Sequence, residues 1–234
     1  EIPPFTEEIK TLLLEKASAD FDWSEISPTI FGAVFESTLN PETRRSGGMH
    51  YTSIENIHKV IDPLFFEELN KEYTEIMGID VAKNRNKRLD TFQKKLAGLT
   101  FLDPACGSGN FLTETYISLR TLENKVIFAR RNGQMEIGTE EHNPIKVSIK
   151  QFYGIEINDF AVTVAKTALW IAESQMLKKT EDILLMHLDF LPLKSYANIR
   201  EADSIDTSWN DIVAPNNISY IMKTHNLTSL SFVK

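Results

Sequence analysis

The sequence predicts an α/β protein in which a parallel sheet follows a helical region. Apolar residues recur at helical spacing through residues 1–98, whereas from Leu99 onward short apolar strands alternate with long helical stretches. Such alternation predicts a parallel sheet covered on both faces. A Gly-x-Gly turn after the first expected strand supports this fold class. We therefore divide the chain into a helical N-terminal region, residues 1–98, and an α/β core, residues 99–234.

The composition indicates a globular protein outside the membrane. Of the 234 residues, 42% are hydrophobic and 25% are charged, and no apolar run approaches the roughly 20 residues needed to cross a bilayer. Without a signal peptide, we expect a cytoplasmic protein. The single cysteine excludes an internal disulfide and a multi-cysteine zinc site. The net charge of −8 argues against strong nonspecific binding of nucleic acid by this chain alone, and Arg44-Arg45 and Lys83–Arg88 are the candidate basic patches.

Capping residues mark the expected helices of the N-terminal region. Thr6, Ser27-Pro28 and Ser53 each precede apolar residues at helical spacing. Asp62-Pro63 is expected to start a further helix, because proline suits the first helical position. The basic run Lys83–Arg88 is interpreted as a connector to the last helix before the sheet.

The α/β core is expected to contain four strands and two long helices. Each strand is a short run that ends at a turn signal or at a polar stretch. Residues 132–144 are polar and are interpreted as a surface insertion. The expected strands are 99–103, 151–157, 198–202 and 218–222, and the expected helices are 110–130 and 160–176.

The turn after the first strand gives the clearest chemical signal. Gly107 and Gly109 allow a ligand to approach the backbone closely, and the free amides at the following helix start can receive an acceptor group. Leu112 stands where the dinucleotide fingerprint requires a third glycine. The carboxylate of Asp103 suits a cationic ammonium better than a pyrophosphate.

The stretch from Asp103 to Phe111 resembles motif I of class I S-adenosyl-L-methionine-dependent methyltransferases, in the form typical of N6-adenine DNA methylases. The resemblance extends over residues 25–222 and implies a Rossmann-like parallel sheet, incomplete at its C-terminal side, with S-adenosyl-L-methionine as cofactor. In this stretch it assigns cofactor binding to Asp103, Pro104, Ala105, Cys106, Gly107, Gly109, Asn110 and Phe111.

Further acidic residues follow the second and third strands. Glu156 can hydrogen-bond both hydroxyls of a ribose, and Gly154-Ile155-Glu156-Ile157 resembles motif II, which implies that Ile157 lies against the cofactor adenine. Residues 198–205 resemble motif III, in which an acid accepts a hydrogen bond from the exocyclic amine of the cofactor. Asp203 is the preferred residue because a short polar strand leads directly into it, and Asp189 is the alternative.

The segment before the first strand supplies one more group of candidates. His50, Tyr51 and Thr52 resemble motif X, and the helix capped by Ser53 offers free amides and a positive dipole end to the methionine carboxylate. Residues 31–65 also resemble the region of large single-chain type II restriction–modification enzymes in which a helical connector joins a nuclease domain to the methylase.

The expected catalytic motif is absent. The motif order X, I, II, III is that of gamma-type adenine methylases, in which Asn-Pro-Pro-Tyr or Asn-Pro-Pro-Phe follows and holds a flipped adenine. Here residues 218–222 are followed by Lys223-Thr224-His225-Asn226, so no catalytic residue is assigned. We expect a truncated or frame-disrupted product that is inactive alone and whose partner, double-stranded DNA, is bound mostly by regions absent from this chain, such as a target-recognition domain.

The sequence leaves three alternatives to an adenine methylase. The intact motif I without a catalytic motif also fits a non-catalytic module for cofactor binding or interaction. Methylation of another nitrogen, in cytosine N4 or a protein glutamine, uses similar chemistry. A nicotinamide-dependent dehydrogenase is disfavoured by Leu112.

Overall fold

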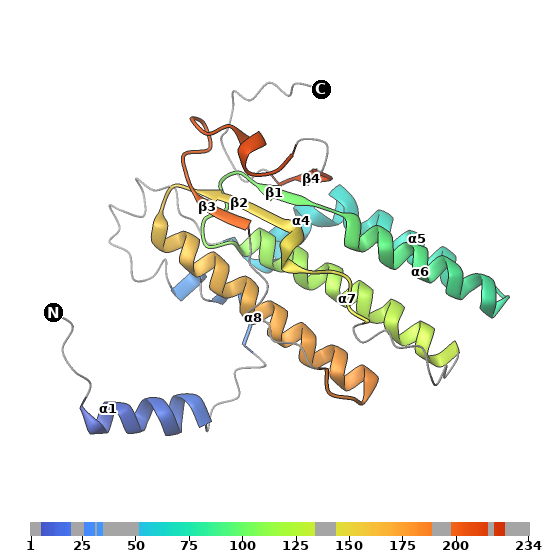
Figure 1. Ribbon diagram of the computed structural model, residues 1–234, viewed down its shortest axis with the longest axis horizontal. Helices are drawn as coiled ribbons and strands as arrows, with labels where there is room; N and C mark the ends of the chain where they lie inside the picture. Colours follow the sequence, from blue (N-terminus) through green and yellow to red (C-terminus); the bar gives the residue numbers. More distant parts are fainter. Residues whose placement is uncertain are drawn as a thin grey trace.

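The computed structural model describes residues 6–19, 26–30, 32–34, 52–133, 144–188, 198–214 and 218–222. At its centre is a four-stranded parallel sheet with the strand order β3-β2-β1-β4 (Figure 1). The direction of chain progression reverses between β1 and β4, which is where open parallel sheets bind ligands. The strands are β1 Phe101–Asp103, β2 Phe152–Glu156, β3 Asn198–Glu201 and β4 Tyr220–Ile221.

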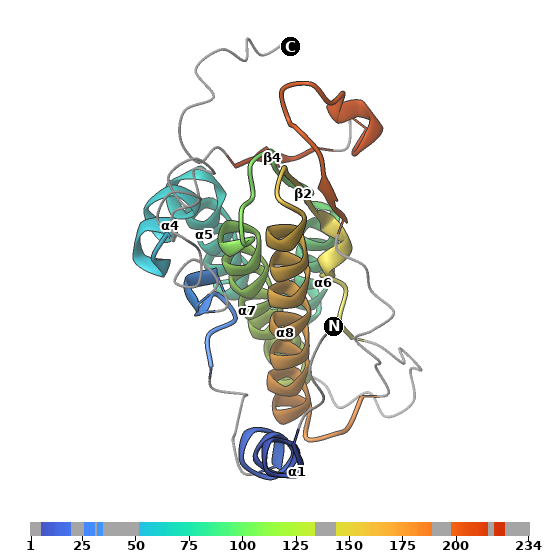
Figure 2. The same ribbon diagram turned by 90° about the vertical axis from the view of Figure 1, so that its left-hand side faces the viewer.

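Two long helices follow the first two strands and lie side by side against the sheet, as Figures 1 and 2 show. They are α7, Asn110–Gly133, and α8, Asp159–Leu184. None of the helices in the described ranges combines the length and apolar character that a bilayer crossing requires. The other helical segments are α1 Glu7–Thr11, η1 Leu12–Ala19, α4 Ile54–Ile61, η3 Asp62–Phe66, α5 Glu67–Met77, α6 Ala82–Gly98, η4 Ile149–Gln151 and η6 Trp209–Asp211.

The predicted fold class is confirmed, and so are two of the predicted helix starts. All four expected strands are present, each one to three residues shorter than expected. Thr6 caps α1 by accepting a hydrogen bond from the amide of Ile9 at 3.3 Å. Ser53 caps α4 by accepting one from the amide of Asn56 at 3.4 Å. These short polar side chains satisfy amides that a helix start leaves unpaired.

Residues 54–77 form one continuous helical run, so the predicted new helix start at Asp62-Pro63 is wrong. Asp62 keeps helical backbone angles, and the π-helical stretch η3 joins α4 to α5. Pro63 lies in the first turn of η3. Proline cannot donate the helical hydrogen bond, and a π-helical stretch is a known way for a helix to absorb such an interruption without ending.

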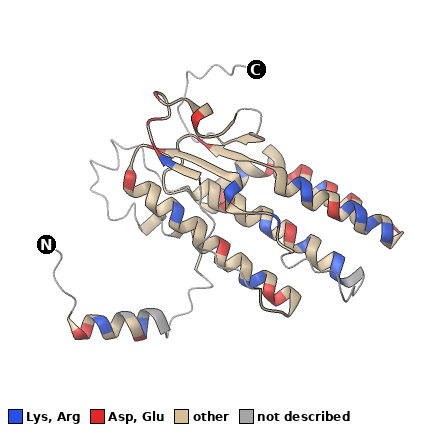
Figure 3. Ribbon diagram, viewed as in Figure 1, with Lys and Arg blue, Asp and Glu red and all other residues tan. Residues whose placement is uncertain are grey.

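The basic run Lys83–Arg88 is not a connector, because it lies within the first turns of α6. Lysine and arginine are good helix formers, and the pattern of charges does not interrupt the helix. Figure 3 shows acidic and basic residues intermixed over α5 and α6. Lys95 on α6, for example, pairs with Glu72 on α5 at 2.6 Å.

One hydrophobic core joins the N-terminal helices to the sheet. Phe101 in β1 stacks on Phe152 in β2 and on Tyr220 in β4, with ring centroids 5.2 and 5.5 Å apart. Phe65 from η3 packs on Phe101 at 5.1 Å, and the same core includes buried residues of α4 to α8. The division at residue 98 therefore marks the change from helices alone to alternating strands and helices, and both parts share one core.

The opposite face of the sheet is covered differently from the prediction. Among the described residues, Leu102 and Ile155 on this face pack with Val213, and Trp209 lies beside them. These covering residues come from the short segment around η6. The sequence predicted helices on both faces, whereas in the described ranges the long helices cover one face only.

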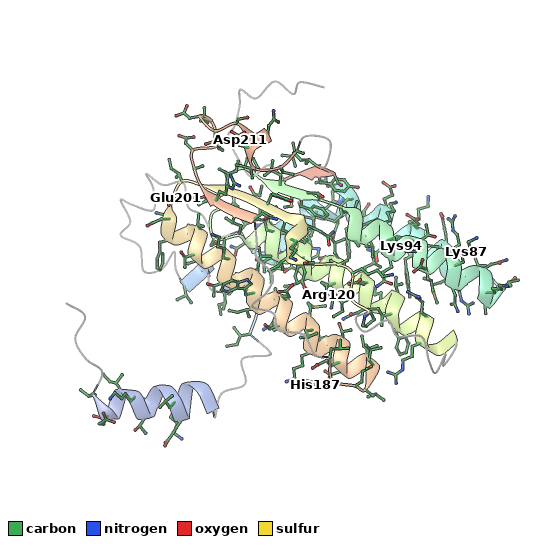
Figure 4. The ribbon with its side chains drawn as sticks, in the orientation of Figure 1. Lys87, Lys94, Arg120, His187, Glu201 and Asp211 are labelled. Carbon is green, nitrogen blue, oxygen red and sulfur yellow. The ribbon has the colours of Figure 1, made fainter. Side chains whose placement is uncertain are left out.

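A buried ion pair connects the helices beneath the sheet. Arg120 and Glu123 on α7 are almost completely buried and pair with each other, and Figure 4 labels Arg120 between α7 and α8. Arg120 also donates to Thr180 on α8 at 2.8 Å. Glu123 accepts from Gln93 on α6 at 2.8 Å and from the amide of Lys146 at 2.7 Å. The pair therefore links α6, α7, α8 and the segment before β2.

Replacing Glu123 with alanine should lower the free energy of unfolding by about 3–5 kcal/mol, because the Arg120 guanidinium would remain buried without its carboxylate. Urea unfolding followed by circular dichroism measures the change. The double variant Arg120→Met/Glu123→Leu removes both charges and should recover much of the loss. Glu7→Ala breaks an exposed ion pair with Lys10 and serves as the control with an unchanged midpoint. An equally unchanged midpoint for Glu123→Ala would contradict this role.

Candidate functional site

The glycine turn after β1 has the backbone that its sequence predicts. Gly107 and Gly109 have φ values of 53° and 77°, in the left-handed region that favours glycine. A β-carbon at Gly109 would lie 2.7 Å from that of Ala165 on α8, so only glycine fits there. A β-carbon at Gly107 would meet nothing within 4 Å. The turn is therefore tightly packed on the helix side and open on the other.

Glu156, at the end of β2, is bound to the glycine turn. One oxygen of its carboxylate accepts the amide hydrogen of Gly107 at 2.9 Å, and the other accepts that of Asn158 at 3.0 Å. Its side chain is buried at the edge of the sheet. A carboxylate has about four lone-pair positions, so two acceptor positions remain for hydroxyl donors.

Asp103, at the end of β1, is the second acid of the site. It is buried, and its carboxylate accepts the amide hydrogen of Ala105 at 3.1 Å. Burial raises the pKa of Asp103 to about 7; the hydrogen bond from Ala105 opposes this shift and the nearby charge of Glu156 adds to it. A cation placed beside this carboxyl would favour its ionised form.

Most of the other candidates in the motif I stretch are buried, and one is exposed. Pro104, Cys106, Asn110 and Phe111 are buried, whereas Ala105 is exposed. The amide of Cys106 donates to the carbonyl of Ile155 at 3.0 Å and fixes the turn to β2, while Phe111 packs in the main core. Burial raises the pKa of the Cys106 thiol well above its ordinary value. These side chains hold the turn in place.

Two of the remaining candidates lie at the same edge of the sheet. Ile157 follows β2 and is 65% exposed, so its side chain is available to a flat ligand. Asp203 follows β3, is half-buried and accepts the amide hydrogen of Ile205 at 2.8 Å. The pairing of β2 with β3 extends to this point, where the amide of Ala202 donates to the carbonyl of Glu156 at 2.9 Å. The alternative, Asp189, lies outside the described residues.

The structure describes only part of the predicted motif X. His50 and Tyr51 lie outside the described residues, and Thr52 is half-exposed immediately before the cap of α4. Sequence reasoning missed the contact that fixes this helix. His58 on α4 lies 2.9 Å from Asp62 and 3.1 Å from Glu114 on α7. Burial alone would lower the pKa of His58, but the hydrogen bonds to both carboxylates raise it, and the imidazole joins α4 to α7.

A second missed residue is Gly32, in the described segment 32–34. A β-carbon there would lie 2.4 Å from Oγ of Ser108 and 2.8 Å from Oδ1 of Asn110. The segment therefore passes directly over the glycine turn. An isolated glycine in a helical pattern often has a packing reason, but the sequence does not identify the partner.

The chain resembles known DNA methyltransferases over most of its length. Residues 79–227 match the family described as "MmeI, DNA-methyltransferase domain". DNA methyltransferase A of Bacillus subtilis (strain 168) is 37% identical over 209 residues, which are 89% of this chain and 22% of that protein. The adenine-specific methyltransferase PglX of Streptomyces coelicolor is 30% identical over 74 residues, 32% of this chain and 5% of that protein.

A solved structure has the same fold. It is that of the Type IIL restriction–modification enzyme MmeI in complex with DNA, with a TM-score of 0.80 and 41% identity over 93% of this chain and 28% of that one. The chain thus spans less than a third of the length of each of these relatives. The matching family, the identity to full-length relatives and the shared fold lead to one conclusion: the chain belongs to the family of MmeI-type DNA-methyltransferase domains.

Proposed function

We propose that this chain is the S-adenosyl-L-methionine-binding part of a site-specific DNA adenine-N6 methyltransferase of a type II restriction–modification system. The observation that supports it most is the double hydrogen bond from the backbone to Glu156, which fixes a carboxylate beside an open glycine turn at the sheet edge. Such an enzyme acts on genomic DNA, so we place it in the cytoplasm.

The residues at this edge fit the proposed cofactor. Glu156 has acceptor positions for the two ribose hydroxyls, and exposed Ile157 offers an apolar surface to the adenine. Asp103 suits the positively charged methionine end of the cofactor. The amides at the start of α4 are partners for the methionine carboxylate. Asp203 would accept a hydrogen bond from the exocyclic amine of the cofactor adenine. When bound, the cofactor supplies an activated methyl group.

The assignment to adenine in DNA is supported by the form of motif I and by the relatives. PglX is named as adenine-specific, and MmeI was solved in complex with DNA. We propose double-stranded DNA as the partner, bound mainly by parts of the full-length protein outside this chain, with nuclease and target-recognition domains among them. Acidic and basic residues alternate along the described helices in Figure 3, which agrees with a limited contribution to DNA binding from this part.

A second candidate is a non-catalytic module that binds the cofactor or a partner protein. It is favoured by the sequence after β4, where Lys223-Thr224-His225-Asn226 stands in place of Asn-Pro-Pro-aromatic. We propose that the chain by itself transfers no methyl group, because this stretch lacks the Asn-Pro-Pro-aromatic sequence that holds a flipped adenine.

Glu156→Gln should weaken S-adenosyl-L-methionine binding by roughly 10- to 100-fold, because hydrogen bonds to a charged acceptor contribute about 1.5–3 kcal/mol. Isothermal titration calorimetry with the 234-residue chain measures the dissociation constant. Asp211→Asn makes the same chemical change at an exposed carboxylate and should leave it unaltered. Equal affinities for both variants would refute the assignment of Glu156.

Cofactor affinity should fall as the pH is lowered from 8 to 6, by up to about tenfold per unit below pH 7, because protonated Asp103 must lose its proton to bind a cation. Titration calorimetry across this range gives the profile. Asp103→Asn should bind more weakly at pH 8 and show a much flatter profile. A slope that persists in Asp103→Asn would assign the pH dependence to another group, such as His58.

The purified chain should transfer no radiolabelled methyl group from S-adenosyl-L-methionine to duplex DNA, because it lacks the catalytic motif. A full-length MmeI-type enzyme on the same DNA is the positive control. Incorporation above the level of boiled protein would contradict the proposal. Cofactor binding without incorporation agrees with it and separates binding from transfer.

A further inference from the structure

An apolar groove lies between α7 and α8, away from the glycine turn. It encloses about 350 Å³ and is lined by Thr121, Asn124, Lys125, Phe128, Met176, Lys179 and Ile183. Phe128 is 52% exposed, so its ring faces solvent in the described chain. The groove begins eleven residues into α7, about 17 Å along the helix from Asn110. It is therefore separate from the proposed cofactor site.

Two lysines border this groove, one on each helix. Lys125 and Lys179 are both exposed. Among the residues that the structure describes, neither amino group has an acidic partner within ion-pair distance. An apolar floor between two such cations suits an amphipathic helix that carries carboxylates on either side of its apolar residues.

The helical segment 7–19, formed by α1 and η1, has this character. Leu12 is 52% exposed, and the exposed carboxylates of Glu8 and Glu15 lie about one turn before and after it. Ile9 and Leu14 are also exposed, and α1 has no buried residue. Isolated helices shorter than about 12–15 residues are marginally stable in water, so a helix of this length needs a packing partner. Figures 1 and 2 both draw it apart from the other helices.

The chain is anchored close to the groove just after this segment. The carbonyl of Ile26 accepts a hydrogen bond from Nε2 of Gln175 on α8 at 2.7 Å. Gln175 lies one turn before Lys179 and about 12 Å along the helix from Ile183. Six residues separate Ala19 from Ile26, and a chain of that length spans up to about 25 Å. The helix can therefore reach the whole groove.

We propose that the helical segment 7–19 docks into the α7–α8 groove of its own chain. Leu12 packs on Phe128 and Ile183, while Glu8 and Glu15 pair with Lys125 and Lys179. The short tether gives the segment an effective concentration on the order of 1 mM at the groove, so docking within one chain outcompetes a second copy at micromolar protein. The groove is thus the binding surface for the N-terminal helical segment of the same chain.

A cross-link tests the docking directly. Thr11→Cys/Thr121→Cys places one thiol on the helix between Glu8 and Glu15 and one at the groove, and the native Cys106 is buried. A short bismaleimide should join the two within a monomer, at a yield that does not change on dilution. The matched control is Thr11→Cys/Lys87→Cys, since Lys87 is exposed on α6, as labelled in Figure 4.

Further variants distinguish docking from chance contact. Lys125→Glu/Lys179→Glu should reduce the cross-link several-fold, and adding Glu8→Lys/Glu15→Lys should restore it. Phe128→Glu should abolish it, with an unchanged unfolding midpoint because this side chain is half-exposed. Cross-linked dimers that diminish on dilution would assign the groove to a second copy and overturn the proposal. A yield equal to that of the Lys87 control would overturn it as well.

Discussion

The carboxylate of Glu156 is the contact on which the arrangement of the site depends. Its two oxygens bind the amides of Gly107 and Asn158, so one side chain fixes the turn after β1 and the start of α8 to the end of β2. Its carbonyl accepts the amide of Ala202, which brings the segment after β3 to the same edge. A carboxylate held in this way presents its free lone pairs in fixed positions, as a preorganised acceptor requires.

The helix α7 carries a second set of constraints. Its first turns hold Glu114, which binds His58 and keeps α4 in place against α7. Further along, Glu123 binds Gln93 on α6 while its partner Arg120 reaches α8. Because each of these polar contacts is directional, they define the register of the helices more strictly than apolar packing alone. The position of the glycine turn thus depends on helices that precede it in the sequence, α4 and α6, and on helices that follow it, α7 and α8.

The sequence predicted the strands and the turn well because their signals are local. Short apolar runs bounded by turns mark the strands, and Gly107 and Gly109 mark the positive-φ positions. The same local reasoning placed a helix start at Asp62-Pro63 and missed the π-helical continuation, whose Phe65 is buried in the core shared with the sheet. It could not find the pair of His58 with Glu114, 56 residues apart, nor recognise Arg120 as buried, because polar residues within a helix normally face solvent.

The contact between Gly109 and Ala165 couples two segments that are 56 residues apart in the chain. With no β-carbon on one side and a methyl group on the other, α8 approaches the turn as closely as atoms permit. A larger side chain at either position would push the helix away and take Asn158, and with it the orientation of Glu156, out of place. Natural sequences with this fold should therefore keep glycine at position 109, where φ is positive, and a small residue at position 165.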